Sequence, residues 1–340
     1  MYMGIILKKL AFERFSGLYI FALLIVIFSI WMPDLFFSLA TLRSVASDKS
    51  ISAMLALSLI IPLSCGTFDL SVAANINFST LLVIKLINGK NEDGIASGLP
   101  LPLAILVTIL VAALIGFVNG FIVVKLKVSS FIATLGTASI IAAMMVVLTG
   151  NRQPLPAVSS AWKSISTTQF LGFQAVFFYM LAIALIVWFV LDHTPTGRYL
   201  FAIGSNADAS RLSGVRVDAY IWMSLVASGA ISGLAGVFYG SLAGPSLTYG
   251  GGLLLPAFAA VFLGSTQISP GRFNVWGTVL SIYLLATGVK GLQLATDVQW
   301  LSPLFSGVAL IVAVSVALNR QDSLVEKKRR KSVEAVSAGE

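Results

Sequence analysis

Long apolar runs, separated by short charged or Gly- and Pro-rich breaks, constrain this chain more than any other feature. A helix needs about 20 predominantly apolar residues to cross the hydrocarbon core of a bilayer. Ten runs approach this length, and the first and eighth are short. They cover residues 17–32, 50–66, 69–87, 101–124, 128–149, 174–191, 219–241, 253–266, 273–290 and 300–318. We therefore predict an all-α polytopic membrane protein with about ten transmembrane helices, some of them short or broken.

The scarcity of charged residues supports the same class. Charged residues make up 11% of the chain and hydrophobic residues 57%, whereas soluble proteins carry about 25% charged residues. A chain this poor in charge cannot cover a water-facing surface, so most of its surface must face lipid or protein. The single cysteine, Cys65, excludes an intramolecular disulfide, and the single histidine, His193, excludes a metal site built from histidines. We expect neither a metal site nor catalytic residues.

Lysine and arginine are unevenly distributed among the segments between the runs. Positive charge is enriched in the cytoplasmic loops of membrane proteins. With the N-terminus in the cytoplasm, fifteen of the 22 Lys and Arg residues fall in cytoplasmic segments, and the other seven fall in outer segments or outer span ends. This distribution predicts that both termini are cytoplasmic. It also attributes the net charge of +8 to membrane topology and not to binding of nucleic acid.

The N-terminus has two interpretations. Lys8, Lys9 and Arg14 precede the first apolar run, which is the order found in a secretory signal peptide. The run is long for such a peptide, and many further runs follow it. We therefore expect an uncleaved first span.

The connections between the runs leave no room for a soluble domain. The longest cytoplasmic loop covers residues 192–218, and the longest outer loop, residues 150–173, is shorter. We predict one transmembrane domain over residues 1–318. Residues 319–340 contain a basic cluster and are expected to form a disordered cytoplasmic tail close to anionic lipid headgroups.

The break between the second and third runs holds the first polar candidates. It reads Cys-Gly-Thr-Phe-Asp-Leu-Ser-Val from Cys65. An Asp at the centre of a membrane helix costs about 2.5–3.5 kcal/mol, so such residues usually face water, protein partners or an interior path. Asp69 and Ser71 could cap the next helix at the cytoplasmic edge, or contact a transported solute. Asn75 and Asn77 follow within two turns and could face the bundle interior.

Further polar residues lie in the fourth and fifth runs. Asn119 stands beside Gly120, and Gly116 lies four residues before Gly120, in a pattern that permits close helix packing. The side-chain amide of Asn119 needs a partner, so we expect a hydrogen bond between helices. The alternative is that Asn119 lines a path for the solute. Thr134 and Thr137 lie one turn apart on one face, although such hydroxyls can also bond to their own backbone. The candidates for a substrate path are Asp69, Ser71, Asn75, Asn77, Asn119, Thr134 and Thr137.

The long cytoplasmic loop carries the signals of a short helix. Asn206 suits the N-cap, Arg211 and Leu212 lie near the end, and Gly214 suits the position just after the helix. The pattern predicts a helix of about two turns outside the membrane. Isolated helices shorter than about 12–15 residues are marginal in water. This helix must therefore pack on its own membrane domain or on a partner subunit.

Taken together, these segments resemble the permease subunits of ribose-, xylose- and galactose-type ABC importers. The resemblance lies in the Gly-Thr-Phe-Asp-Leu-Ser-Val stretch, the turn at Gly116–Gly120, the run at 131–137 and the loop that ends at Gly214. The Ala-Ala-Val-Phe-Leu-Gly-Ser-Thr stretch from Ala259, with Pro-Gly-Arg-Phe-Asn after it, is similar too. The resemblance as a whole covers roughly residues 50–318. The family usually has Gly-Gly-Ile-Asp-Leu-Ser-Val-Gly at the break and glycines at the positions of Gln267 and Pro270, departures that bear on the substrate more than on the architecture.

The resemblance implies a set of partners in a bacterial inner membrane. A homodimer, or a heterodimer with a sister permease, would enclose the path for a monosaccharide or similar small polar solute. A periplasmic solute-binding protein would deliver the solute, and cytoplasmic ATP-binding subunits would hold the ATP and Mg, so no cofactor is expected in this chain. The ATPase-docking candidates are Gly204, Asn206, Arg211, Leu212 and Gly214.

The source of energy separates the two main hypotheses. The chain has no G-x-x-x-x-G-K-[ST] phosphate loop, so it is not expected to be an enzyme that hydrolyses ATP. A secondary transporter, driven by a proton or sodium gradient, often carries acidic or histidine relays inside its spans. No carboxylate or histidine lies in the interior of a predicted span, and Asp69, in the short break between the second and third spans, comes nearest. We favour alternating access driven by a partner ATPase, with Gly229, Gly233 and Gly236 permitting close helix packing.

Overall fold

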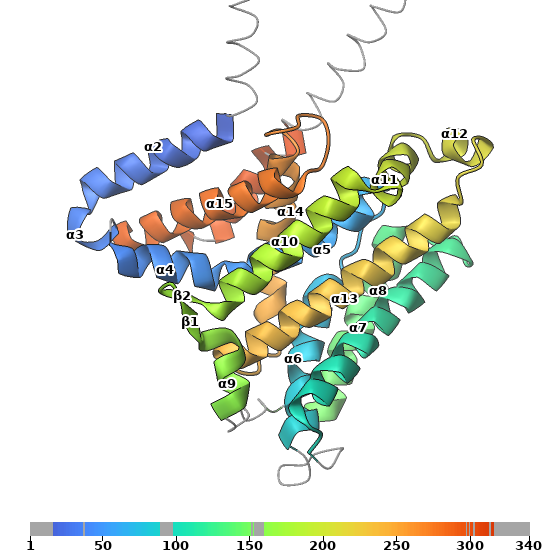
Figure 1. The fold of residues 1–340 in the computed structure, drawn as a ribbon, viewed down its shortest axis with the longest axis horizontal. Helices are drawn as coiled ribbons and strands as arrows, with labels where there is room; N and C mark the ends of the chain where they lie inside the picture. The colour runs from blue at the N-terminus through green and yellow to red at the C-terminus, as the bar shows by residue number, and fades with distance from the viewer. Residues whose placement is uncertain are drawn as a thin grey trace, which may run out of the picture.

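The computed structural model describes residues 16–36, 38–88, 98–150, 152, 160–296, 298, 300–301, 303–312 and 314–315. Almost all of these residues are helical, and one two-stranded hairpin interrupts the helices. Figure 1 shows long helices lying side by side, with the shorter elements at their two ends. The predicted tail, residues 319–340, lies outside the described residues.

The elements follow one another along the chain as short and long helices. They are α2 (Ser16–Trp31), α3 (Pro33–Phe36), α4 (Leu39–Asp48), α5 (Ser50–Ser64), α6 (Val72–Asn88), α7 (Leu101–Val124), α8 (Ser130–Thr149), α9 (Ser160–Thr167), β1 (Gln169–Phe170), β2 (Phe173–Gln174), α10 (Ala175–His193), α11 (Pro195–Ser205), α12 (Ala207–Leu212), α13 (Val217–Ala243), α14 (Tyr249–Gly264) and α15 (Val275–Thr296). A further apolar helix covers Pro303–Val312.

Each predicted apolar run coincides with an apolar helix. Within the described ranges, six helices are long and apolar enough to cross a membrane, and four shorter apolar helices accompany them. The six are Leu39–Ser64, Leu101–Val124, Ser130–Thr149, Ala175–His193, Val217–Ala243 and Val275–Thr296. The structure therefore agrees with a polytopic all-α membrane protein.

The predicted second span was wrong at its start. Residues 50–66 were expected, whereas α4 and α5 together form a 26-residue apolar span that begins at Leu39. Lys49 interrupts the apolar pattern in the sequence and was placed at an outer span end. In the structure it occupies the junction of the two helices, between the ten residues of α4 and the fifteen of α5. The outer loop also holds α9 and the β-hairpin, which the sequence analysis did not predict.

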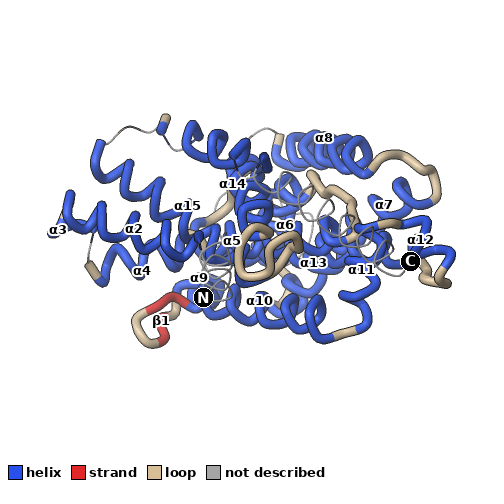
Figure 2. Tube along the Cα trace, turned by 90° about the horizontal axis from the view of Figure 1, so that it is seen from above, coloured by secondary structure: helices blue, strands red, loops and turns tan. Residues whose placement is uncertain are grey.

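Helix α5 lies at the centre of the bundle. All fifteen of its residues are buried, and it contacts α6, α10, α13, α14 and α15. Figure 2 shows α5, α6 and α13 in the middle of the assembly, with α2 and α4 towards one end and α7 and α12 towards the other. In contrast, α7 and α8 expose large apolar side chains such as Leu114, Ile140 and Val147. Such outward apolar faces are expected where helices meet lipid.

Helix α13 packs against α6 and α7 through small residues. A Cβ atom on Gly229 would meet the carbonyl oxygen of Ala112, and one on Gly236 would meet the carbonyl oxygen of Ile76. A Cβ on Gly233 would clash with the Ala112 side chain. These contacts confirm the close packing predicted for the three glycines, because any larger side chain would push the helices apart.

The far end of α13 is fixed by α9. The Ser241 hydroxyl donates to the Trp162 carbonyl oxygen at 2.8 Å and accepts from the Ser166 amide at 3.1 Å. The Ser166 hydroxyl in turn donates to the Phe238 carbonyl oxygen at 3.0 Å. Trp162 is fully buried beside them. The segment between α8 and α10 is therefore attached to the end of α13 that lies far from α12.

Helix α14 begins inside the bundle. The Gly250 amide donates to Asn77 Oδ1 at 2.8 Å, while Asn77 lies in the second turn of α6. The end of α13 lies further along α6, since Gly240 packs against Thr80 and Ile84. Residues 244–248 therefore turn back into the bundle. With 16 residues, α14 is about 24 Å long, which explains why the eighth apolar run is short.

Substitution of the packing glycines tests this arrangement. We expect Gly229→Ala to lower the midpoint of thermal unfolding in detergent, because overpacking of a close contact costs about 1–3 kcal/mol. Gly136→Ala on α8 is the matched control, since a Cβ there meets no atom within 4 Å. It should leave the midpoint unchanged or raise it, through the higher helix propensity of alanine. Equal midpoints for the two variants would contradict the packing described.

Candidate functional site

The irregular segment between α5 and α6, residues 65–71, is the polar centre of the bundle. Pro62 lies in the last turn of α5, and its carbonyl oxygen accepts from the Thr67 amide at 3.0 Å and the Thr67 hydroxyl at 2.9 Å. Gly66 has φ of +77°, a conformation that side chains other than glycine rarely adopt. The chain therefore leaves the helix in a tight turn, in which Thr67, Asp69 and Ser71 are buried while Gly66 and Phe68 are exposed.

Asp69 ends this turn with a fully buried side chain. Its Oδ1 accepts from the Ser71 amide at 3.1 Å and from the Ser71 hydroxyl at 2.6 Å. The Ser71 carbonyl oxygen accepts from the Asn75 amide and starts the hydrogen bonding of α6. The capping interpretation of Asp69 and Ser71 thus agrees with the local geometry. Asp69 Oδ2 and the hydroxyl of nearby Ser228 form no standard hydrogen bond within the described part of the chain.

Asn119 connects α7 to the same turn. Its Nδ2 donates to the Ser71 hydroxyl oxygen at 2.8 Å, and its side chain is fully buried. This is the hydrogen bond between elements that the sequence predicted for an amide deep in an apolar span. Asn119, Ser71 and Asp69 therefore form one chain of hydrogen bonds.

The N-terminus of α8 satisfies backbone groups of the turn. The Phe68 amide donates to the Ser130 hydroxyl and the Leu70 amide donates to the Thr134 hydroxyl, each at 3.0 Å. Thr134 donates onward to the Ser130 carbonyl oxygen at 2.7 Å. The role of Ser130 was missed in the sequence, although its place at the start of a helix beside Thr134 was visible. Thr137 bonds only to Ala133 of its own helix in the described contacts.

Two asparagines of α6 fix its neighbours. Asn75 Nδ2 donates to the Gly229 carbonyl oxygen at 3.1 Å and to the Ser232 hydroxyl at 2.9 Å, both on α13. Asn77 Nδ2 donates to the Leu247 carbonyl oxygen at 3.0 Å, in addition to its bond with Gly250. Both amides are buried and face the interior of the bundle, as predicted.

Two cavities lie elsewhere in the described part of the bundle, and none of the seven predicted path residues lines either of them. The larger, of about 670 Å³, lies between α2, α4, α10 and α15 and has mainly apolar walls. The smaller, of about 370 Å³, lies between α5, α14, α15 and the Pro303–Val312 helix, and its wall includes Lys49. The described residues contain no cluster of three His, Cys, Asp or Glu side chains that could hold a metal.

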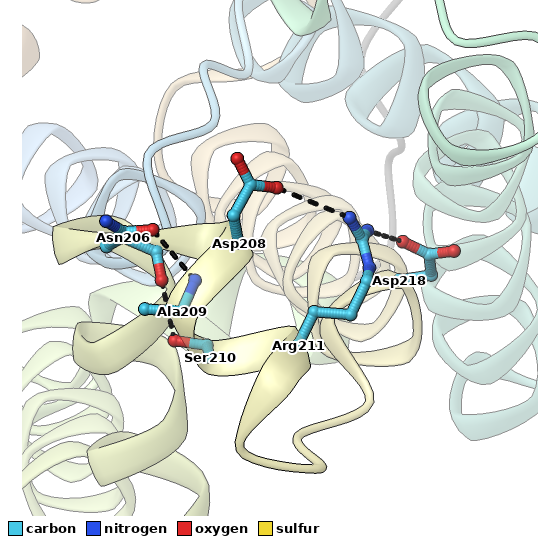
Figure 3. A network of polar contacts seen from close by, with 6 residues as sticks. All are labelled: Asn206, Asp208, Ala209, Ser210, Arg211 and Asp218. Carbon is cyan, nitrogen blue, oxygen red and sulfur yellow. Dashed lines mark hydrogen bonds and ion pairs between the residues drawn. The ribbon is translucent and has the colours of Figure 1, made fainter.

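The predicted helix of the cytoplasmic loop is present as α12. Asn206 Oδ1 accepts from the Ala209 amide at 2.9 Å, as expected of an N-cap (Figure 3). Gly214 has φ of +82° and follows the helix as predicted. Leu212 points away from the bundle and is 90% exposed. An exposed leucine at the end of a short polar helix is available for contact with another subunit.

Two arginines form ion pairs at this end of the molecule. Arg211 donates to Asp218 Oδ1 at 2.8 Å and lies 3.7 Å from Asp208 Oδ1, which holds α12 against the start of α13 (Figure 3). Arg272 pairs with Asp192 at 3.1 Å and stacks 3.8 Å from the Phe201 ring. The pairs of Arg211 are exposed, so they orient the loop more than they stabilise it. The sequence assigned no role to Arg272, because its partners come from other loops.

The segment between α10 and α13, which carries α12, contacts the irregular segment after α5. Gly204 ends α11, and a Cβ there would clash with the carbonyl oxygen of Ser64 at the end of α5. Gly66 approaches the Cα of Gly204 from the other side. The two glycines allow the loop that carries α12 to lie directly against the irregular segment.

Comparison with known proteins gives a consistent result. Residues 41–314 match a protein family described as "Branched-chain amino acid transport system / permease component". The chain is similar to the ribose import permease protein RbsC of Haemophilus influenzae, with 30% identity over 296 residues that cover 86% of this chain and 89% of that protein.

Two further relatives are permeases of one import system. The chain is 30% identical to the autoinducer 2 import system permease protein LsrC of Salmonella paratyphi B over 280 residues, which cover 81% of this chain and 78% of that protein. It is 28% identical to the permease protein LsrD of the same organism over 295 residues, 84% of this chain and 86% of that protein. No solved structure matches the chain.

Removal of the Asn77 amide tests how the start of α14 is held. We expect Asn77→Ala to speed hydrogen exchange about ten- to hundredfold over residues 244–252, because a lost buried partner costs about 1–3 kcal/mol. Exchange is measured by mass spectrometry on protein in nanodiscs. Thr137→Val is the control, since its hydroxyl bonds only within α8 among the described contacts. Unchanged exchange in Asn77→Ala would show that other contacts fix this segment.

Proposed function

Because this chain belongs to the family of permease components of branched-chain amino acid transport systems, we propose that it forms the membrane path of an ABC importer for a monosaccharide or similar small polar solute. The observation that carries the proposal is the similarity to import permeases along nearly the whole chain. This similarity confirms the resemblance to ribose-type permeases that the sequence motifs indicated. The chain is thus a transport subunit and not an enzyme.

The proposal assigns an arrangement to the subunit. About ten spans would cross the bacterial inner membrane, with both termini in the cytoplasm, residues 1–318 as the permease domain and residues 319–340 as a basic tail. A second copy or a sister permease would complete the path. A periplasmic protein would deliver the solute, and cytoplasmic subunits would bind ATP and Mg. The exposed Leu212 on α12 supports the cytoplasmic contact.

Most of the seven predicted path residues have a structural role in the proposed importer. Six of them bond to other elements or to the irregular segment, which favours fixing of residues 65–71 over direct contact with solute. Gly204 packs against the end of α5 beside this segment. A motion of the docking loop would therefore reach the bundle centre through the contact between Gly204 and Ser64.

Reconstitution tests the energy source. The chain is purified together with its partner ATPase, placed in liposomes and supplied with the solute-binding protein. The liposomes should accumulate solute only when ATP is present. A variant ATPase that cannot hydrolyse ATP is the control and should abolish uptake. Uptake by the chain alone, driven by a sodium or proton gradient, would contradict the proposal and support a secondary transporter.

Substitution of Leu212 tests the docking surface. Leu212→Glu should reduce co-purification of the ATPase about tenfold or more, because a charge at an apolar contact must be desolvated. Leu171→Glu is the matched control. Leu171 is also 90% exposed, and it lies in the β-hairpin at the opposite end of the molecule from α12. Equal loss in both variants, or in neither, would show that α12 is not the docking element.

A further inference from the structure

The smaller cavity has both polar and apolar side chains in its wall, and none of the predicted path residues lies there. It lies where the junction of α4 and α5 faces the first turns of α14, the middle of α15 and the Pro303–Val312 helix. Its polar side chains are Lys49, Ser52 and Ser306, and the backbone of Gly251 and Gly252 forms part of its wall. We call this space the Lys49 cavity.

Lys49 is a charged residue within an apolar span. Among the described residues its ammonium group has no ion-pair or hydrogen-bond partner. The charged groups that act on it are Asp48 and Lys290. The Asp48 carboxylate is exposed and accepts from the Ser44 hydroxyl at 2.9 Å, so water screens it. The Lys49 ammonium group in the cavity wall therefore forms no ion pair among the described residues, and its nearest acidic neighbour, Asp48, lies in exposed surroundings.

Ser52 differs from the other serines of α5. Ser50, Ser58 and Ser64 each donate to a backbone carbonyl oxygen of the preceding turn, at 2.7 Å. Ser52 is only 4% exposed, yet its hydroxyl forms no hydrogen bond within the described ranges. The hydroxyl is not one of the fully enclosed unpaired atoms of the bundle, and it lies in the cavity wall. A ligand in the cavity can therefore accept a hydrogen bond from it.

The start of α14 adds a weak positive field. A Cβ on Gly251 or Gly252 would meet no atom within 4 Å, so this turn leaves the cavity open. The amides of Tyr249 and Gly250 already donate to Ser246 and Asn77. The helix therefore contributes its N-terminal dipole and not free donors, and recognition rests on Lys49 and Ser52.

We propose that the Lys49 cavity binds a small organic anion on its way through the bundle. The Lys49 ammonium would pair with a carboxylate, and the Ser52 hydroxyl would donate to the same group. Apolar side chains of α14 and α15, such as Leu253 and Leu285, would contact the carbon skeleton. The inference rests on the proposed function and narrows the solute class from neutral sugars to acidic ones of similar size, such as sugar acids.

The single native cysteine makes a direct test possible. In a Cys65→Ala background, Ser52→Cys places one thiol in the cavity, and Ser58→Cys places one on the same helix outside it. Both variants, in nanodiscs, are treated with a negatively charged and a positively charged methanethiosulfonate reagent. With each rate divided by the rate of the same reagent with a free thiol, the anionic reagent should modify Ser52→Cys at least about tenfold faster than the cationic one, because the Lys49 charge attracts one reagent and repels the other. Ser58→Cys should remain unmodified.

Second-site variants identify the source of the preference. Lys49→Met added to Ser52→Cys should abolish the preference for the anionic reagent, and Lys49→Arg should retain it. D-gluconate should slow the modification several-fold more than D-ribose at the same concentration. An unreactive Ser52→Cys, equal rates for both reagents, a preference that survives Lys49→Met, or equal protection by both sugars would overturn the inference. These measurements need no ATPase, so failure of ATP-driven uptake would be distinguished from failure of this site.

Discussion

The structure depends on how a stretch of non-helical backbone is satisfied inside a membrane bundle. Amide and carbonyl groups away from water must find partners within the protein. At residues 65–71 these partners are side chains of α8 and of the turn itself, and α7 adds a bond to a side chain of the turn. Ser130 and Thr134 of α8 accept from the turn, Asn119 of α7 donates to Ser71, and Asp69 of the turn itself caps α6. The turn therefore holds α6, α7 and α8 in position.

Small residues and amides act together around this turn. Glycines on α13 bring its backbone close to α6 and α7, and the short distance lets Asn75 reach backbone groups of α13. A longer separation would leave the Asn75 amide unpaired in an apolar interior, at a cost of about 1–3 kcal/mol. The hydrogen bonds of Asn75 therefore depend on the close packing of α13 against α6, and they also stabilise that packing. In the same way, Gly204 lets the loop that carries α12 approach the backbone at the end of α5.

Sequence reasoning predicted the elements whose signals are local. Hydropathy located every apolar helix, and capping residues located α12, because Asn206 and Gly214 act on their own backbone. It could not predict that α14 starts inside the bundle, since this follows from the contact of Asn77 with Gly250, 173 residues away. It placed Lys49 at the end of a span, because a single charge usually marks a span end. In the structure Lys49 lies at the junction of α4 and α5, a position that depends on contacts with other helices. The partners of Arg272 and Ser130 were hidden for the same reason.

One consequence follows from the length of α13 and from what is attached to its two ends. The helix has 27 residues and spans about 40 Å. Asp218 near its first turn is tied to Arg211 of α12, and Ser241 near its last turn is tied to Trp162 of α9. One continuous helix thus links the loop that carries α12 to the segment that carries α9, so a change in the tilt of α13 alters the position of both attachments.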